Sequence, residues 1–318
     1  MPSETAEMPL IDDLSPVRGR YEAARDMSAL TWLRVGGPAE VLFAPADADD
    51  LAAFLKAYDG PLTTVGVGSN LIIRDGGLPG VVIRLSPRAF GGAEVLDGAR
   101  MRVGAATLDA QVAKAAAKAG IAGLEFLRTI PGAIGGALAM NAGCYGVYTA
   151  DVFESATAIT RKGETVTLTG EDMNFAYRSS NPPEEVIYTS AILKGHSDYP
   201  VAIEQRMQDA LDKREQSQPT KDRTAGSTFR NPAGFSSTGK GDHSQDLMAW
   251  KLIDEAGCRG LRLGGAIMNV KHSNFLTNAD NATAADLENL GEEVRRRVLK
   301  THGITLEWEI KRIGVQAK

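Results

Sequence analysis

The sequence predicts an α+β fold in which two small N-terminal lobes precede a C-terminal domain that starts near Pro200. Three observations support this prediction. The chain of 318 residues is long enough for two or three domains with buried cores. Short β-like apolar runs alternate with amphipathic helical segments, without internal repeats or low-complexity tracts. A glycine-rich stretch, Gly123–Gly146, divides the middle of the chain.

Composition and charge exclude several classes of protein. The chain has 43% hydrophobic and 24% charged residues and a net charge of −5, which argues against a general nucleic-acid binder or a protein adsorbed to anionic lipid. No apolar run approaches the roughly 20 residues of a membrane helix. The acidic, polar N-terminus lacks the pattern of a secretory signal, so we expect residues 1–26 to form a loosely ordered leader.

The cysteines and histidines do not indicate a metal site. Only two cysteines occur, Cys144 and Cys258, and the four histidines show no metal-ligand spacing. We therefore expect a metal-free protein in the reducing environment of the cytoplasm.

Residues 27–88 form the first predicted lobe, a small β-α-β unit. Two glycine-bearing loops interrupt it, Val35–Pro38 and Gly66–Asn70. Acidic residues ahead of a helically spaced apolar set mark a helix start, and short apolar runs bounded by turn residues indicate strands. The predicted strands are Ala39–Phe43, Pro61–Val65, Leu71–Arg74 and Val81–Leu85, and the predicted helix is Asp47–Tyr58.

Residues 89–199 form the second predicted lobe, in which the chain changes to short strands. An alanine-rich helix, Thr107–Ala119, ends at Gly120 and leads into the glycine-rich stretch. A helix-start pattern occupies Gly170–Asn174. The predicted strands are Met101–Ala105, Val152–Ile159, Thr165–Leu168 and Val186–Leu193.

Residues 200–304 form the predicted C-terminal domain, and residues 305–318 contain a last strand, Thr305–Ile313, that returns to the rest of the chain. The polar stretch Gly234–His243 is expected to be a mobile surface loop. Helical periodicity predicts the helices Val201–Gln216, Met248–Ala256 and Ala282–His302, and strand pieces are expected at Leu261–Ala266 and Phe275–Thr277.

The stretch Gly123–Gly146 carries six glycines among apolar residues, a composition that suits neither a helix interior nor an ordinary strand. Each glycine in a regular element costs roughly 0.5–1 kcal/mol relative to alanine. Repeated glycines therefore indicate a backbone that approaches another group closely, and bare N–H groups near an anion are the commonest functional reason. A tightly packed turn is the alternative, but at this density a cofactor pyrophosphate site is favoured.

Six segments together resemble one family. They are TWLRVGGPAEVLF, VGVGSNLIIRDGG, IPGAIGGALAMNAGCYG, FAYRSSN, AGSTFRNP and LIDEAGCRGLRLGGA. Their order and rough spacing are similar to those of the UDP-N-acetylenolpyruvoylglucosamine reductases, flavoproteins that make UDP-N-acetylmuramate for bacterial peptidoglycan. The resemblance spans Met27 to Gly314. It implies the two-lobed FAD-binding fold shared with vanillyl-alcohol oxidase and p-cresol methylhydroxylase, followed by a C-terminal α+β substrate domain.

The resemblance also implies which residues approach FAD. Glycine backbones and their N–H donors suit a diphosphate, so the physical argument agrees with the family match. Arg34 alone would be read as a solvated loop charge, and it is included because of that match. The implied residues are Arg34, Val35, Gly36, Gly37, Val65, Gly66, Val67, Gly68, Ser69, Asn70, Leu71, Ile130, Pro131, Gly132, Ile134, Gly135, Gly136, Asn141, Ala142 and Gly143.

Three residues carry the chemistry by this resemblance: Arg178, Ser227 and Glu309. NADPH is expected to reduce FAD, and a hydride then passes to the terminal carbon of the enolpyruvyl C=C of UDP-N-acetylglucosamine enolpyruvate. Ser227 fits as the proton donor, because a transient enolate is basic enough to accept from a serine. Arg178 and Glu309 would stabilise the developing charge, Glu309 in a protonated or strongly hydrogen-bonded form.

Each of these residues has an ordinary alternative. Ser227 alone would be a turn serine, and Arg178 alone a surface arginine with Tyr177 facing the opposite way in an extended segment. Glu309 has a rival in Glu307, two residues earlier on the same expected strand face. Glu309 is preferred because the C-terminal LEWEIKRIG aligns with the family ending at its second glutamate.

The substrate diphosphate requires cationic or amide donors near the C-terminal domain. Asn231 matches a family position that contacts substrate. The basic residues Arg214, Lys221, Arg223 and Arg230 are supported only by position and charge, and a solvated charged face is an equally weighted alternative for them. The candidates for substrate binding are Asn231, Arg230, Arg214, His272 and Asn274. The short interval between Tyr199 and Ser227 lacks room for the tyrosine-bearing loop of one family branch, so the chain resembles the shorter branch.

Two other functions remain open at this point. One is a flavin oxidase of the same fold, which often holds FAD covalently through histidine or cysteine. Neither N-terminal loop contains a histidine, so non-covalent FAD is expected, although Cys144 leaves a small opening. The other is a non-catalytic FAD electron-transfer subunit, which would have no use for Ser227 and Glu309. No nucleic-acid or membrane partner is expected.

Overall fold

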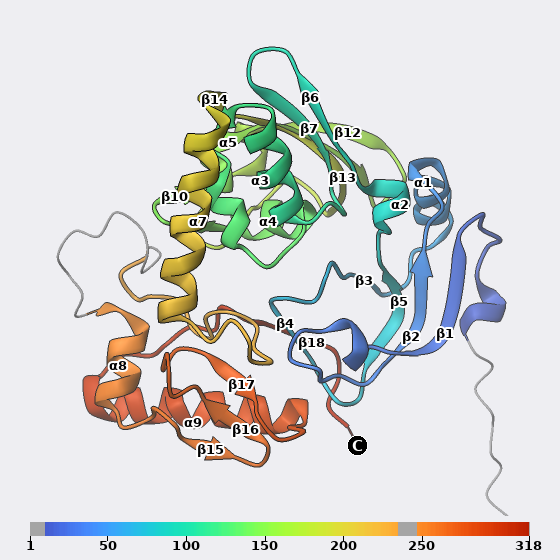
Figure 1. Cartoon of the computed structure of the whole chain (residues 1–318). Helices are drawn as coiled ribbons and strands as arrows, with labels where there is room; N and C mark the ends of the chain where they lie inside the picture. Colours follow the sequence, from blue (N-terminus) through green and yellow to red (C-terminus); the bar gives the residue numbers. More distant parts are fainter. Residues whose placement is uncertain (1–9, 235–246, 318) are drawn as a thin grey trace, which may run out of the picture.

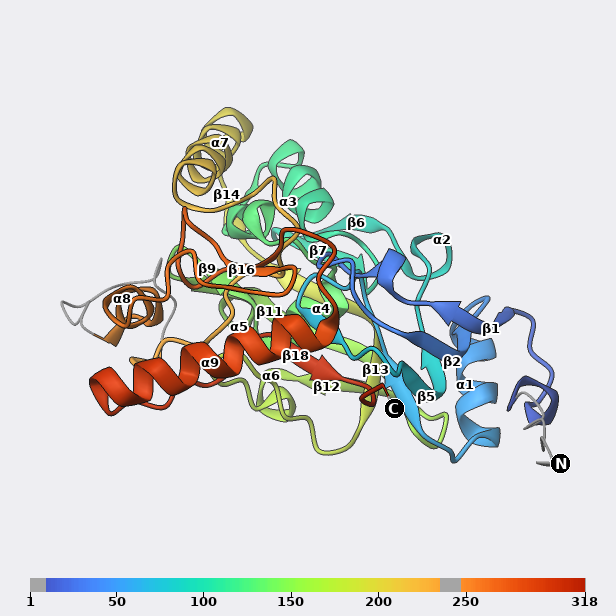
Figure 2. The ribbon, with the colours of Figure 1, turned by 90° about the horizontal axis from the view of Figure 1, so that it is seen from below.

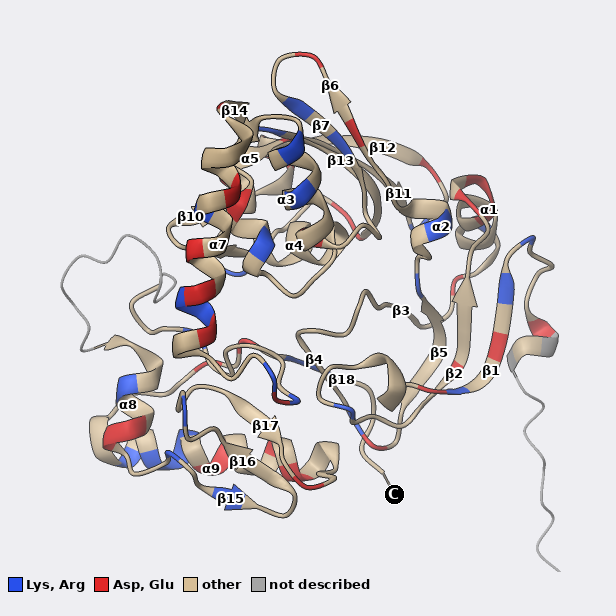
Figure 3. Ribbon diagram, viewed as in Figure 1, with Lys and Arg blue, Asp and Glu red and all other residues tan. Residues whose placement is uncertain are grey.

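A computed structural model describes residues 10–234 and 247–317. Its elements form three groups, shown in Figure 1: the N-terminal lobe in blue, a second lobe in green, and a C-terminal part in orange and red. The helix α7 (Pro200–Ser217) runs from the second lobe toward the C-terminal part, and it carries both acidic and basic residues along its length (Figure 3). Among the described helices, none is both long and apolar enough to cross a membrane.

The N-terminal lobe is built on a four-stranded sheet with the order β1-β2-β5-β3. The strands β2, β5 and β3 are parallel, and β1 joins the edge in antiparallel register. The rings of Phe43 of β2 and Phe54 of α1 pack together in the core, tilted by 47° with centroids 4.6 Å apart. The elements of this lobe are η1 (Leu10–Asp13), β1 (Arg20–Asp26), η2 (Ser28–Leu30), β2 (Pro38–Ala44), α1 (Ala48–Ala57), β3 (Leu62–Thr64), β4 (Leu71–Ile73), β5 (Leu78–Ile83) and α2 (Pro87–Phe90).

The expectation that residues 1–26 form a loosely ordered leader is wrong for Arg20–Asp26. This segment is strand β1, and Tyr21 packs its ring 5.1 Å from the ring of Phe43. The segment carries four charged residues in seven and none of its residues is buried, so it lacks the apolar alternation by which a strand is recognised. Its pairing with β2 is decided by tertiary contacts.

The second lobe is built on a five-stranded antiparallel sheet with the order β12-β11-β13-β7-β6. The helix α4 packs on β7 and β13, and α3 packs on η3. Its elements are β6 (Ala93–Leu96), β7 (Arg100–Gly104), α3 (Asp109–Lys118), β8 (Ile121–Ala122), η3 (Glu125–Thr129), α4 (Ile134–Met140), β9 (Gly143–Cys144), β10 (Val147–Tyr148), α5 (Thr149–Val152), β11 (Phe153–Thr160), β12 (Thr165–Thr169), α6 (Gly170–Met173), β13 (Val186–Lys194) and β14 (His196–Ser197).

The glycine-rich stretch contains a helix, α4, which its composition did not predict. Gly135 brings the start of this helix against β7: a Cβ at Gly135 would lie 3.3 Å from the carbonyl oxygen of Ala105. The helix ends at Asn141, whose φ of 39° is left-handed. Close packing against the sheet therefore offsets the intrinsic cost of two glycines in a helix.

The C-terminal part packs the long helix α9 against a three-stranded sheet, β15-β16-β17, and against α8. Figure 2 shows α9 running across the face of this part with α8 near one end. The last strand, β18, leaves the domain and pairs in parallel with β4 of the N-terminal lobe. The elements are α8 (Ala249–Glu255), β15 (Arg262–Leu263), β16 (Ala266–Met268), β17 (Leu276–Asn278), α9 (Ala284–His302) and β18 (Lys311–Ile313).

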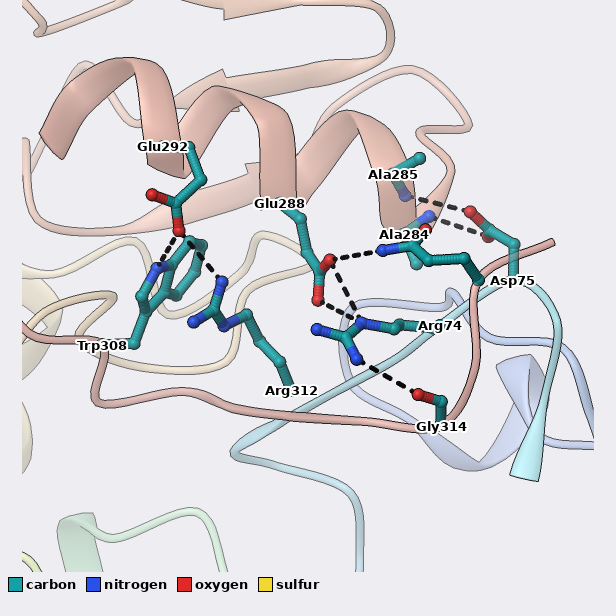
Figure 4. Close-up of polar contacts among 10 residues, drawn as sticks. Arg74, Asp75, Ala284, Ala285, Glu288, Glu292, Trp308, Arg312 and Gly314 are labelled. Atoms are coloured by element: carbon teal, nitrogen blue, oxygen red, sulfur yellow. Dashed lines mark hydrogen bonds and ion pairs between the residues drawn. The ribbon is translucent and has the colours of Figure 1, made fainter. Parts of the chain in front are cut away.

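A polar clasp joins the turn after β4 to α9 (Figure 4). The carboxylate of Asp75 accepts the N–H groups of Ala284 and Ala285 at 2.9 and 3.0 Å, and so satisfies two free donors at the start of α9. Arg74 donates from Nε to Glu288 at 3.0 Å and from Nη1 to the carbonyl oxygen of Gly314 at 3.2 Å. The clasp fixes the C-terminal part on the N-terminal lobe.

Most helices and strands predicted from the sequence are confirmed, and a further correction concerns the C-terminus. Only Lys311–Ile313 of the predicted strand Thr305–Ile313 is a strand. Before it, Trp308 forms an isolated antiparallel bridge with Phe229, its ring packs 5.0 Å from the ring of Phe229, and its Nε1 donates to Glu292 of α9 at 2.8 Å. Residues 235–243 of the expected mobile loop lie outside the described residues.

Candidate active site

A cavity of about 470 Å³ lies where the two lobes and the C-terminal part meet, a size typical of ligand sites. Residues 64 and 66–71 of the N-terminal lobe line one part of it, and residues 129–145 of the second lobe supply most of another. Its polar and charged lining includes Asn70, Asp109, Arg178, Arg214, Ser227, Glu309 and Lys311.

The loop Gly66–Asn70 presents free backbone donors to this cavity. Within the described chain, none of its five N–H groups donates to a protein acceptor, while the carbonyl oxygen of Gly68 accepts from Trp32 at 3.1 Å. Gly68 has φ +68°, and a Cβ there would lie 2.3 Å from the carbonyl oxygen of Leu30. Glycine is therefore required at this position, and the free amides form a cradle suited to a phosphate.

The second lobe brings part of the glycine-rich stretch to the same cavity. Six of the predicted cofactor residues lie in its wall: Ile130, Pro131, Gly132, Gly136, Ala142 and Gly143. The amides of Ile134 and Gly135 donate instead to the carbonyl oxygens of Thr107 and Ala105, at 3.0 and 2.8 Å. Asn141 donates to the carbonyl oxygen of Ala176 and accepts from the amide of Ala150, both at 3.0 Å. These three residues hold the wall in shape.

Five further predicted cofactor residues are not among the described residues that line the cavity: Arg34, Val35, Gly36, Gly37 and Val65. Close packing accounts for the two glycines, since a Cβ at Gly37 would lie 2.2 Å from the carbonyl oxygen of Asp75. Val35 and Val65 are buried in the core. Arg34 donates to the carbonyl oxygen of Ala29 at 2.5 Å. Their approach to FAD stays a prediction.

Arg178 lies in a tight turn of the second lobe and not in the extended segment expected from the sequence. Ala176 and Ser179 exchange backbone hydrogen bonds at 3.0 and 3.2 Å, and Arg178 has φ +58°. Its guanidinium lies over the ring of Tyr177, 5.3 Å from the centroid, so the two side chains do not face opposite ways. A left-handed, non-glycine backbone at a cavity wall is typical of functional residues.

Arg178 and Glu309 form a buried ion pair. Arg178 Nε lies 2.9 Å from Glu309 Oε1, with the side chains 13% and 12% exposed, and Arg178 Nη1 donates to the carbonyl oxygen of Gly143 at 3.0 Å. Burial raises the pKa of Glu309 above the ordinary carboxyl value, although the charge of Arg178 opposes that shift. The site thus contains a carboxyl group that is easier to protonate than an exposed one.

The backbone around Glu309 is held against the segment that carries Ser227. The N–H of Glu309 donates to the carbonyl oxygen of Thr228 at 2.8 Å, and the side-chain amide of Asn70 donates to the carbonyl oxygen of Glu309 at 3.1 Å. Glu307 is 76% exposed and lies 3.9 Å from Arg230. The two glutamates therefore have different environments, and only Glu309 lines the cavity.

Ser227 lines the cavity between Gly226 and the buried residue Thr228. Gly226 before it has φ +76°, a conformation that glycine adopts without strain. Thr228 after it is fully buried, donates its N–H to the carbonyl oxygen of Asn274 and accepts the N–H of Leu276 at its hydroxyl, both at 2.8 Å. The serine is half-buried, and its backbone is fixed from the C-terminal side.

The predicted substrate-binding residues occupy different places. Arg214 lines the cavity, donates to the carbonyl oxygen of Thr129, and donates from Nε to Gln218 at 3.1 Å. Asn274 is buried, and its amide exchanges two hydrogen bonds with the backbone of Phe229, at 3.0 and 2.8 Å. It therefore supports the serine segment. Arg230, Asn231 and His272 are not among the described residues that line the cavity.

Several lining residues were not predicted from the sequence. They are Asp109, Thr129, Cys144, Tyr145, Gln218, Phe275 and Lys311, among others. Asp109 resembled an ordinary acidic helix start, and Lys311 an ordinary strand charge, so no local signal distinguished them. Cys144 Sγ lies 3.0 Å from the hydroxyl oxygen of Thr129, and burial raises the pKa of its thiol, which makes the thiolate less available.

Together these residues provide the elements of an anion-binding redox site. Free amides suit a diphosphate, Arg178 suits a carboxylate, and Ser227 with Glu309 offers two groups that can donate protons. The donor set fits a dinucleotide cofactor in the two lobes and an anionic substrate near Arg178.

Two protein families match the chain. The family described as "UDP-N-acetylenolpyruvoylglucosamine reductase, C-terminal domain" matches residues 218–313, and the family "FAD binding domain" matches residues 39–169. A UDP-N-acetylenolpyruvoylglucosamine reductase from Ruegeria pomeroyi is 60% identical over 95% of this chain and 98% of its own length. One from Dinoroseobacter shibae is 59% identical over 95% and 97%.

A solved structure agrees with these sequences. The crystal structure of UDP-N-acetylenolpyruvylglucosamine reductase from Thermus caldophilus is 33% identical and superposes with a TM-score of 0.76. The similarity covers 93% of this chain and 99% of that one. The two-lobed FAD-binding region followed by a C-terminal α+β domain, predicted from the sequence, is thereby confirmed.

Proposed function

This chain belongs to the UDP-N-acetylenolpyruvoylglucosamine reductase family, and from that premise we propose what its residues do. It is an FAD-dependent oxidoreductase that reduces the enolpyruvyl group of UDP-N-acetylglucosamine enolpyruvate, giving UDP-N-acetylmuramate for peptidoglycan. The observation that carries the assignment of roles is the convergence of Arg178, Ser227 and Glu309 on one cavity beside the loop Gly66–Asn70.

FAD would be held chiefly by backbone donors. We assign its pyrophosphate to the free amides of Gly66–Asn70, with the wall Ile130–Gly132 and Ala142–Gly143 supporting the rest of the cofactor. Bound FAD would supply hydride to the substrate after accepting it from NADPH. The buried, high-pKa thiol of Cys144 fits non-covalent binding, since a covalent link through cysteine requires a reactive thiolate.

Arg178 binds and polarises the substrate carboxylate. Its guanidinium is oriented on three sides, by Glu309, by the carbonyl oxygen of Gly143 and by the ring of Tyr177. A fixed guanidinium loses little freedom when an anion binds, and its charge stabilises the enolate that forms beside the carboxylate.

Ser227 donates the proton that completes reduction of the double bond. The hydroxyl of a serine is a weak acid, but an enolate carbon formed beside a carboxylate is a strong enough base to accept its proton. Thr228 anchors the segment in the core, so the hydroxyl is held at the cavity wall while the substrate is bound.

Glu309 stabilises the developing negative charge in its protonated form. Burial favours the neutral acid, and a substrate carboxylate on Arg178 would weaken the ion pair that keeps Glu309 ionised. A neutral carboxyl can then donate a hydrogen bond to the enolate oxygen. Glu307, exposed and outside the cavity, has no such role.

The substrate diphosphate and NADPH are assigned to the same end of the cavity. Arg214 and Lys311 are the cations in the cavity wall besides Arg178, so they are the donors best placed for phosphate oxygens. NADPH would use this cleft in alternation with the substrate. A cytoplasmic location is part of this proposal, since UDP-linked precursors and NADPH are cytoplasmic molecules.

The proposed function is tested by the two half-reactions. The purified yellow protein is reduced with NADPH under anaerobic conditions, and UDP-N-acetylglucosamine enolpyruvate is then added while the flavin absorbance is followed. Return of the oxidised spectrum with formation of UDP-N-acetylmuramate is expected. A reduced flavin that persists until oxygen is admitted would instead indicate an oxidase, and acid precipitation that leaves flavin on the protein would indicate covalent FAD.

A further inference from the structure

Asp109 is a buried carboxyl group without a partner in the described chain. It is the first residue of α3, its exposure is 0%, and neither carboxyl oxygen is hydrogen-bonded to any described residue. Buried polar groups in folded proteins are almost always satisfied, so an unpaired acid requires an explanation. The helix does not supply one, because the N–H groups of Gln111 and Val112 donate to the carbonyl oxygen of Leu108.

The carboxyl group lies in the wall of the cofactor cavity, next to Gly132. Asp109 is one of the residues that line the cavity, and its N–H donates to the carbonyl oxygen of Gly132 at 3.1 Å. A Cβ at Gly132 would lie 2.5 Å from Asp109 Oδ2. The absence of a side chain at Gly132 therefore leaves the space that the carboxyl group occupies at this wall.

Burial favours the neutral form of Asp109. Burial raises the pKa of this carboxyl well above its usual value, and no cation contributes to the shift. A neutral carboxylic acid carries one O–H donor and an acceptor oxygen. It can therefore form hydrogen bonds with an uncharged polar group without bringing a second negative charge into the cavity.

Two observations place Asp109 near the reacting end of the cavity. Asp109 packs against Gly132, Thr129 of the same segment lies 3.0 Å from Cys144 Sγ, and the neighbouring carbonyl oxygen of Gly143 accepts from Arg178 at 3.0 Å. The free amides that suit phosphate lie on the other lobe, at Gly66–Asn70. A neutral acid on the second lobe is thus suited to the uncharged half of the cofactor, the ring system and its ribityl chain.

We propose that Asp109 is a cofactor-binding residue whose carboxyl group exchanges a hydrogen bond with the flavin half of FAD. The inference rests on the proposed function for the identity of the cofactor. In the FAD-free protein the carboxyl group destabilises the fold, because it is buried without a partner. In the complex FAD supplies that partner, so the same residue contributes to affinity.

The test compares Asp109→Leu and Asp109→Asn in the full-length protein, with and without FAD. Leucine removes the polar group at similar volume, so the FAD-free variant should melt at a higher temperature than the wild type. Its Kd for FAD, measured by quenching of flavin fluorescence, should rise about 10-fold, because a polar group of FAD then loses its partner. The asparagine variant keeps a hydrogen-bond donor and an acceptor, so its Kd for FAD should lie within about 3-fold of the wild-type value.

The control is Asp50→Leu. Asp50 is also buried, but it accepts the backbone N–H groups of Arg18, Gly19 and Ala46 at 2.7–2.9 Å, in the N-terminal lobe outside the cavity lining. Its replacement should lower the melting temperature and leave the Kd of the folded protein for FAD unchanged. If the leucine variant does not fold, Asp109→Ala replaces it, and the same rise in the Kd for FAD is expected.

The visible spectrum of bound flavin separates the two possible partners. A shifted absorption band in Asp109→Leu would indicate a contact with the ring, and an unchanged band with weakened binding would indicate the ribityl chain. Wild-type affinity in both apolar variants would overturn the inference, as would an Asp109→Asn protein that binds as weakly as Asp109→Leu. A wild-type protein that binds no FAD would instead overturn the proposed function.

Discussion

Arg178 Nε lies 2.9 Å from Glu309 Oε1, although the chain between the two residues runs through the second lobe and most of the C-terminal part. Three backbone features make the pair possible. Arg178 projects from a left-handed turn, Glu309 is bonded through its N–H to Thr228, and Trp308 fixes the chain to α9. The side-chain amide of Asn70 in the N-terminal lobe also donates to the carbonyl oxygen of Glu309, at 3.1 Å, so the pair depends on all three parts of the molecule, and so should the reaction.

Replacement of Glu309 by glutamine should slow the reduction of substrate about 10- to 100-fold, because the amide cannot supply an acidic proton and no longer neutralises Arg178. Reduction of FAD by NADPH should keep its wild-type rate. Stopped-flow absorbance measures the two half-reactions separately. Glu307→Gln is the matched control, since this exposed carboxylate lies outside the cavity and its loss should change neither rate. Full activity in Glu309→Gln would contradict the proposed role.

The rate of substrate reduction should fall as the pH rises through the raised pKa of Glu309. The active form is the protonated acid, so its fraction is highest at low pH and decreases above the pKa, which lies above the ordinary value of about 4.3. Arg178 and Arg230 face this carboxyl and oppose the shift. A pH profile of the single-turnover rate measures this decrease. The decrease should be missing from the residual activity of Glu309→Gln, and its presence there would assign it to another titrating group.

Arg214→Gln should raise the KM for the UDP-linked substrate about 10-fold with a much smaller change in kcat. The guanidinium lies in the cavity wall, where it can bind phosphate oxygens, and its hydrogen bonds go to Gln218 and Thr129 rather than to Arg178 or Glu309. Steady-state kinetics with varied substrate test this prediction. Lys213→Gln, an exposed neighbour on the same helix, is the control and should have the wild-type KM.

The clasp between the N-terminal lobe and α9 should contribute to stability. Glu288→Ala leaves Arg74 without its carboxylate partner and removes the acceptor of Gln316, so we expect a loss of about 2 kcal/mol in the free energy of unfolding. Asp75→Ala should cost about 1 kcal/mol, because the two N–H groups at the start of α9 lose their acceptor.

Urea denaturation measures both changes. The control is Glu293→Gln on the same helix, whose pairs with Arg296 and Arg297 are exposed to solvent and should contribute nothing measurable. A destabilisation of Glu293→Gln equal to that of Glu288→Ala would show that the loss of any carboxylate from α9, and not the loss of the clasp, causes the effect, since neither change lowers helix propensity.

The sequence was sufficient to predict the order of the elements and the family, because helical periodicity, terminating glycines and the glycine loops are local signals. It could not predict β1, a charged edge strand stabilised by β2, or α4, a glycine-containing helix stabilised by β7. Both depend on contacts between segments that are distant in the sequence.

The same distinction applies to the site. Arg178, Ser227 and Glu309 lie in short, specific motifs, whereas the groups that support them do not. Thr228 and Asn274 act through hydrogen bonds with the backbone. The local sequence does not distinguish them from other polar residues of similar size. The turn at Arg178 was expected to be extended, because a left-handed arginine has no sequence signature.

The most direct test of the account is the anaerobic half-reaction of Ser227→Ala. Because Ser227 is the proposed proton donor and takes no part in hydride transfer from NADPH, NADPH should bleach the flavin of this variant at the wild-type rate. Addition of UDP-N-acetylglucosamine enolpyruvate should then restore the oxidised spectrum about 10²- to 10⁴-fold more slowly than in the wild type, the contribution expected of a general acid. Reoxidation by the substrate at the wild-type rate would contradict the assignment of Ser227 and the mechanism built on it.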